Sequence, residues 1–184
     1  MRTPTRRHLE RISCAAWLAV ALLAAHPAAA AEEAFASAEV AHSPEAVWAV
    51  LSDFSRWDRV FSSVSSLAVE PIDAVRTRLH LRTAVAGRVV RYTLIATSDA
   101  RARRIDCALD RSAPADVAAL ASTWQLRETA AGDTRIELFV RSDSGVAVPR
   151  FVERRFTERS TRQSVEALVS ALDAERPVAI AAAD

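Results

Sequence analysis

The sequence predicts an α+β fold, with a curled antiparallel sheet of about six to seven strands and a long C-terminal helix across its concave face. Three observations support this prediction. Residues 64–141 alternate between apolar and polar side chains in short runs, the pattern of half-buried strands. Two short helical runs come earlier, directly after a first strand-like run. One long helical run follows the strands, so helices and strands are segregated as in the α+β class.

The composition is that of one globular domain. Of the 184 residues, 51% are hydrophobic and 26% are charged, which suits a folded core. Three glycines and 7 prolines exclude collagen-like and low-complexity architectures. The basic residues are all arginines, and their near balance with the acids leaves a net charge of +1. This balance predicts no nucleic-acid partner.

Residues 1–31 are predicted to be an export signal peptide. A basic start is followed by the apolar stretch 12–25 and by the small residues 29–31, where cleavage is expected. The pair Arg6 and Arg7 resembles a twin-arginine export signal, and an ordinary secretory leader explains it equally well. Either route predicts a periplasmic or secreted protein. Residues 32–176 would then form the folded domain and 177–184 a loose tail.

The first elements of the mature chain are a strand and two short helices. Phe35–Ala41 is strand-like, and Ser43 then offers a hydroxyl cap for a helix with proline at its first position. Ser55 is expected to cap the second short helix, over residues 56–61.

The remaining elements are strands and one helix. We predict strands at 64–72, 75–85, 88–97, 103–109, 117–128 and 134–141. Within 75–85, the three arginines and His80 share one face, while Leu79 and Leu81 share the other. A long helix is predicted from Arg150 to Glu175, ended by Pro177. A twisted sheet of this size curls, and this helix is the element large enough to cover its concave face.

Three segments resemble a known family. They are similar to parts of START-related helix-grip proteins, which include polyketide cyclases and coenzyme Q-binding proteins. The segments are His42–Trp57, Trp124–Glu128 together with Gly132–Ile136, and Val148–Val152. The similarity spans nearly all of residues 35–175. One departure is Ser122-Thr123, where a glycine often precedes the tryptophan. The resemblance implies a helix-grip fold whose cavity holds a lipid, quinone or polyketide-like molecule without a cofactor.

The candidate ligand-binding residues come from the sheet and from the long helix. The apolar part of the ligand is expected to lie along Leu79, Leu81, Tyr92, Trp124, Phe151 and Phe156. Arg155 and Arg159 interrupt the apolar stripe of the helix, and a guanidinium group suits a carboxylate or phosphate head group. The alternative is that these arginines extend to the rim of the cavity and leave the ligand alone.

Residues for catalysis are scarce. His42 and His80 are the only histidines after residue 31, and no Gly-x-Ser-x-Gly motif is present, which argues against a serine-hydrolase triad. Cys107 has no cysteine or histidine spaced for zinc, which predicts no metal site and a buried thiol. A cyclase would have to use Tyr92 or Asp106. We therefore expect no catalytic residue and favour a binding protein over a cyclase or dehydratase.

A third possibility is an interaction protein with a filled cavity and a basic docking face. Residues 75–105 contain eight arginines, from Arg76 to Arg104, and a single acidic residue, Asp99. Such a face would attract anionic lipid head groups, although a run of charges is also the ordinary composition of a solvated sheet face.

Overall fold

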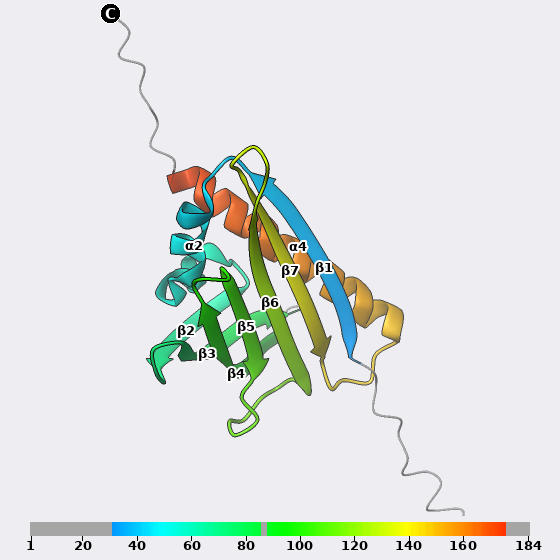
Figure 1. Ribbon diagram of the computed structural model, residues 1–184. Helices are drawn as coiled ribbons and strands as arrows, with labels where there is room; N and C mark the ends of the chain where they lie inside the picture. The colour runs from blue at the N-terminus through cyan, green and yellow to red at the C-terminus, as the bar shows by residue number, and fades with distance from the viewer. Residues whose placement is uncertain (1–30, 86–87, 176–184) are drawn as a thin grey trace, which may run out of the picture. The chain divides into compact units, whose positions relative to one another are not determined.

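The computed structural model describes residues 31–85 and 88–175, which form a seven-stranded antiparallel sheet with helices packed on it (Figure 1). The strands are β1 (Glu32–Val40), β2 (Val64–Pro71), β3 (Arg76–Val85), β4 (Arg88–Asp99), β5 (Arg104–Leu109), β6 (Ala119–Glu128) and β7 (Thr134–Asp143). The helices are α2 (Pro44–Ser52), the 3-10 turn η1 (Phe54–Arg56), α3 (Trp57–Val60) and α4 (Arg150–Glu175). Residues 1–30 of the predicted leader, residues 86–87, and residues 176–184 with the predicted tail lie outside the described residues.

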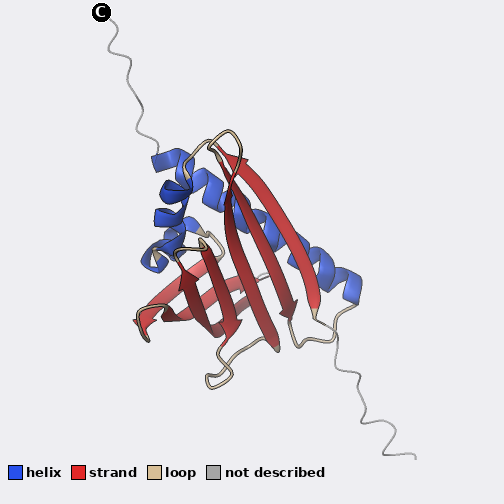
Figure 2. Cartoon of the chain, in the orientation of Figure 1, coloured by secondary structure: helices blue, strands red, loops and turns tan. Residues whose placement is uncertain are grey.

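The strand order is β1-β7-β6-β5-β4-β3-β2, so β1 and β2 form the two edges. The two short helices after β1 and the long helix lie on the same side of the sheet (Figure 2). The α+β fold class is therefore confirmed, with strand ends within a few residues of those predicted. Helix α4 has the predicted bounds.

Helix α2 begins as its sequence predicts. Ser43 accepts a hydrogen bond from the Ala46 amide at 3.3 Å, and Pro44 occupies the first turn. The expected cap at Ser55 is wrong. The Asp53 carboxylate, a stronger acceptor two residues earlier, takes the Ser55 amide at 3.2 Å and starts η1, while α3 has no side-chain cap.

Aromatic residues from α3 and its ends fill one end of the concave face. The rings of Phe61 and Trp124 stack with their centroids 5.8 Å apart, and Trp57 lies edge-on to Phe61. The Trp57 indole donates to the Leu51 carbonyl at 3.0 Å, so its polar atom is satisfied although the side chain is buried. This cluster closes the end of the sheet that lies under α2 and α3.

Helix α4 covers part of the concave face. It packs mainly against β1 and β7 and also contacts α2 and α3. Its buried residues are Thr157, Thr161, Val165, Leu168 and Leu172, which recur at intervals of three or four. The buried stripe thus begins with two threonines and becomes apolar toward the C-terminus. In the part of the chain that the structure describes, no helix has the length and apolar character needed to span a bilayer.

Candidate functional site

The candidate site is a surface of the sheet that faces the helices. Alternate residues of β3 to β7 point to that side, and the strand register places Leu81 opposite Tyr92, Leu94 opposite Leu109, and Ser122 opposite both Cys107 and Val140. We call the following residues the inner wall: Leu81, Tyr92, Leu109, Leu120, Ser122 and Val140. They span five adjacent strands.

The inner wall is only partly covered by the rest of the core. Tyr92, Leu109, Leu120, Ser122 and Val140 are only half-buried, although they point to the helix side of the sheet. By contrast, the inward residues beside α2 and α3 are buried, among them Trp124, Leu126 and Ile136. The concave side is therefore packed at one end and accessible at the other, next to the N-terminal half of α4.

The inner wall is apolar with a few hydroxyl groups. Inward positions 77–83, 90–98, 105–109, 120–126 and 134–142 carry uncharged side chains throughout. Burial raises the pKa of the Tyr92 hydroxyl, against a smaller lowering by the neighbouring Thr83 side chain. Tyr92 is therefore a protonated phenol at neutral pH and serves as a hydrogen-bond donor.

Cys107 lies on the same face of the sheet as the inner wall, opposite Ser122, as a neutral thiol. It is 3% exposed, and burial raises its pKa to about 12, against a smaller lowering by the Ser122 side chain. A thiol with this pKa is neither a nucleophile nor a metal ligand near neutral pH. The expectation of a buried structural cysteine is confirmed. Residues 31–85 and 88–175 contain no cluster of three acidic, histidine or cysteine side chains that could hold a metal ion.

The predicted ligand-binding residues of the sheet come together. Leu79, Leu81 and Trp124 are at most 5% exposed and belong to the same core as Tyr92, which is half-buried. Trp124 stacks on Phe61 and so contributes mainly to the packed end. Leu81 and Tyr92 are cross-strand partners at the accessible end.

The predicted residues of the helix lie elsewhere. Phe151 is 66% exposed and Phe156 41%, and Arg155 and Arg159 are exposed as well. At about 100° per residue, the two arginines lie roughly 160° around the helix from the buried Thr157. The structure therefore does not bring these four residues together with Leu81 and Tyr92, and their contact with a ligand stays a prediction.

Sequence reasoning missed the two threonines that face the sheet from the first half of α4. Thr157 and Thr161 are each 1% exposed, and the Thr157 hydroxyl lies 2.9 Å from that of Ser142 on β7. A search for apolar periodicity passes over threonines. The signal was the spacing of Thr157, Thr161 and Val165, four residues apart on one helix face.

Asp106, the second candidate acid, lies on the opposite face of the sheet. Arg104 donates two hydrogen bonds to it, at 2.7 and 2.8 Å, and Thr123 a third at 2.6 Å. The bonds with Arg104 are the main reason that its pKa is lowered. Asp106 is therefore an ion-paired carboxylate away from the inner wall. His80 is also on that outer face, beside Thr93 and Glu70.

The arginines between Arg76 and Arg104 are largely neutralised by nearby acids. Five of the eight have a carboxylate partner: Arg76 with Asp73, Arg78 with Glu70 and Asp110, Arg91 with Asp116, Arg103 with Glu45, and Arg104 with Asp106. All six of these acids lie outside residues 76–104, on neighbouring strands, on loops and, for Glu45, on α2. A count along the sequence alone therefore overstates the charge of this face.

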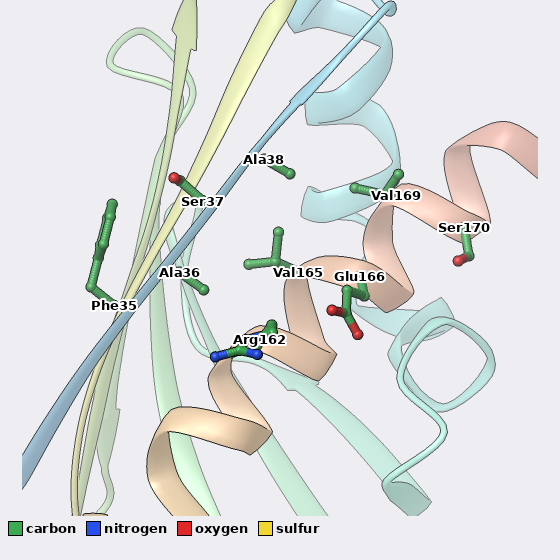
Figure 3. Close-up of a pocket in the computed structure, with 9 residues that line it drawn as sticks. All are labelled: Phe35, Ala36, Ser37, Ala38, Arg162, Val165, Glu166, Val169 and Ser170. Carbon is green, nitrogen blue, oxygen red and sulfur yellow. The ribbon is translucent and has the colours of Figure 1, made fainter. Parts of the chain in front are cut away.

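An open groove of about 630 Å³ lies on the other flank of α4, along the free edge of β1 (Figure 3). Ala36 and Ala38 of β1 face Val165 of the helix, and Arg162 and Glu166 of the helix also line the groove. None of the eight predicted ligand-binding residues lines this groove. A hydrophobic ligand there would stay in contact with water and with two charged groups, whereas small-molecule sites bury most of their ligand.

Comparison with known proteins identifies the family. Residues 32–175 match the model of the family described as polyketide cyclase / dehydrase and lipid transport. A curated relative is the granaticin polyketide synthase bifunctional cyclase/dehydratase of Streptomyces virginiae, 30% identical over 114 residues. That match covers 62% of this chain and 36% of the relative, so the chain spans little more than a third of its length.

Two solved structures share the fold. The ZhuI aromatase/cyclase of Streptomyces sp. R1128 is 17% identical with a TM-score of 0.69, over 78% of this chain and 94% of that one. A START superfamily protein of Mycobacterium smegmatis is 14% identical with a TM-score of 0.68, over 77% and 97%. These matches confirm the helix-grip fold. With the family model matched across the whole folded domain, the chain belongs to the polyketide cyclase / dehydrase and lipid transport family.

Proposed function

We propose that this protein binds a small hydrophobic molecule of the lipid, quinone or polyketide-like class on the inner wall, between the sheet and α4. The observation that carries the proposal is the partial exposure of Tyr92, Leu109, Leu120, Ser122 and Val140, which face the helices and yet are not covered by them. The family, whose description includes lipid transport, supports the same class of ligand.

The chemistry of the inner wall favours an uncharged ligand. Its side chains offer apolar surface together with the hydroxyls of Tyr92 and Ser122, and no charged group among the inward positions. A buried carboxylate without a cationic partner costs several kcal/mol or shifts to its neutral form. A molecule with carbonyl or hydroxyl oxygens on an apolar frame fits this surface better than a fatty-acid anion.

The protein is proposed to act outside the cytoplasm, after removal of the leader at residues 1–31. This part of the proposal rests on the basic, apolar and small-residue segments of the leader sequence. The face from Arg76 to Arg104 has no membrane role in the proposal, because five of its eight arginines are paired with acids.

A cyclase or dehydratase activity is the second candidate. The relative from Streptomyces virginiae has a name of this kind, and Tyr92 is a protonated hydroxyl on the inner wall that would donate to a carbonyl oxygen. The candidate is weaker because Asp106, the other expected acid, is on the outer face and ion-paired.

Native mass spectrometry of the protein recovered after expression tests the proposal. The protein is then extracted with organic solvent, and the extract is analysed for bound molecules. A copurified uncharged lipid, quinone or polyketide supports binding, and conversion of an added polyketide supports the enzyme. A protein that carries nothing and takes up neither a naphthoquinone nor a long-chain alcohol contradicts both and favours an interaction protein.

A further inference from the structure

The first turns of α4 and the loop before them expose an unusual amount of apolar surface. Five of the eleven exposed large hydrophobic residues in the described chain lie within residues 146–156. They are Val146, Val148, Phe151, Val152 and Phe156, with exposures of 53, 39, 66, 43 and 41%. We call them the α4 patch. A concentrated apolar patch of this kind marks a contact surface.

The α4 patch is not explained by ligand binding on the inner wall. At about 100° per residue, Phe151 and Val152 lie roughly 120° and 140° around α4 from Thr157, which faces the sheet, and both are exposed. The side chains of the patch therefore point toward solvent.

Arginines without ion-pair partners surround the α4 patch. Arg150, Arg155, Arg159 and Arg162 are exposed, and within residues 31–85 and 88–175 no carboxylate lies within ion-pair distance of any of them. Arg154 pairs with Glu158 at 3.6 Å, and Glu153 is occupied by the Ser144 amide at 2.6 Å. The four arginines therefore keep their positive charge available, unlike most of those between Arg76 and Arg104.

We propose that the α4 patch docks the protein on an anionic lipid surface. Phenylalanine and valine side chains would enter the boundary between head groups and acyl chains, while the arginines extend to phosphate groups. Guanidinium groups pair with phosphate through two hydrogen bonds, and each basic residue near an anionic surface strengthens the attraction. The positive charge also argues against a second copy as the occupant, because four cationic side chains would meet four others.

The α4 patch lies near the accessible end of the inner wall. The Ser142–Thr157 contact joins the end of β7 to the first half of α4, at the end of the sheet where the inner wall is accessible. A protein docked through the patch would hold this end near the lipid. The docking inference does not depend on the inner wall binding a ligand.

Vesicle cosedimentation tests the inference. The chain from Ala31 onward, which contains the whole sheet and its helices, is mixed with phosphatidylcholine vesicles that contain either no phosphatidylglycerol or 30 mol% of it. We expect binding to the anionic vesicles and a decrease as salt is raised. Phe151→Ser with Phe156→Ser, and separately Arg155→Ala with Arg159→Ala, should each lower the partition coefficient by about tenfold or more.

Matched variants control for general effects of charge and apolar area. Arg82→Ala with Arg101→Ala removes two exposed arginines from elsewhere, and Phe35→Ser with Phe139→Ser removes an exposed aromatic pair on the outer face. Both should bind anionic vesicles like the wild type. Equal binding to neutral and anionic vesicles overturns the inference, and so do equal losses in the patch and control variants. A third contradicting outcome is a protein that binds no vesicles and forms a dimer, if Phe151→Ser with Phe156→Ser dissociates that dimer.

Discussion

The hydroxyl of Ser142 on β7 lies 2.9 Å from that of Thr157 on α4. Nearer the C-terminus of α4, the face that packs on the sheet is made of apolar side chains. Thr157 also donates to the Glu153 carbonyl at 3.0 Å, so its single proton is used within the helix and Ser142 supplies the proton between the two hydroxyls. This bond holds the first half of α4 at the accessible end of the inner wall.

Thr157→Val should therefore destabilise the fold. The substitution keeps the shape of the buried side chain but leaves the Ser142 hydroxyl without its acceptor, at a cost of about 1 to 2 kcal/mol. Thr161→Val is the matched control, because Thr161 is equally buried and its hydroxyl bonds only to the Thr157 carbonyl of the same helix. Urea unfolding should show the larger loss for Thr157→Val. Equal losses would mean that the contact between β7 and α4 contributes nothing.

Tyr92→Phe should weaken the binding of a ligand that carries a carbonyl oxygen. Loss of one hydrogen bond predicts an affinity lower by about threefold to tenfold. Quenching of tryptophan fluorescence by a naphthoquinone measures this change. Tyr92→Phe should bind a long-chain alkane label with unchanged affinity, since the apolar wall remains. Equal loss for both probes would show that the substitution disturbs the wall itself rather than one hydrogen bond.

Arg155→Ala with Arg159→Ala should leave the ligand preference unchanged. If the arginines clamped an anionic head group, the double variant would lose affinity for palmitate and keep it for hexadecanol. Because both side chains are exposed on the far side of α4, we expect the ratio of the two affinities to match that of the wild type. Isothermal titration with both probes gives this ratio. A selective loss of palmitate binding would show that the two arginines bind the carboxylate of the ligand.

The thiol of Cys107 should make stability fall at alkaline pH. Its pKa is about 12 in the folded protein, well above that of an exposed thiol, so between these values the unfolded chain loses a proton that the folded protein retains. The free energy of unfolding then decreases as pH rises, by roughly 2 kcal/mol between pH 8 and 10. Cys107→Ser lacks this titration and provides the reference. Parallel pH profiles for the two proteins would contradict the buried neutral thiol.

The sheet and α4 were predictable because their signals are local. Alternation in residues 75–85 assigns Leu79 and Leu81 to the buried face, and the structure confirms it. The helix from Arg150 to Glu175 follows from its spacing and from the proline beyond it. The resemblance of the segment His42–Trp57 to helix-grip proteins is likewise confirmed by the family match.

The site was less predictable because it depends on which way α4 faces. Phe151 and Phe156 are large and apolar, and a pattern of hydrophobic residues assigns them to the interior, whereas the interior face is made by Thr157 and Thr161. A threonine whose hydroxyl bonds to the preceding turn of its own helix packs as an apolar residue does. The pairing of Arg78 with Asp110 was hidden for a different reason, since the two residues are 32 positions apart.

If a ligand binds against the inner wall, a large side chain at position 122 will occupy its place, and Ser122→Phe makes that change. Ser122 is half-buried in the middle of the wall, between Cys107 and Val140. We predict that the added ring occupies the ligand space, so that naphthoquinone affinity falls at least about tenfold while the midpoint of urea unfolding stays near that of the wild type. If the space is already packed, the ring will instead destabilise the fold by about 1 to 3 kcal/mol. That loss of stability, with naphthoquinone affinity unchanged, would contradict the account.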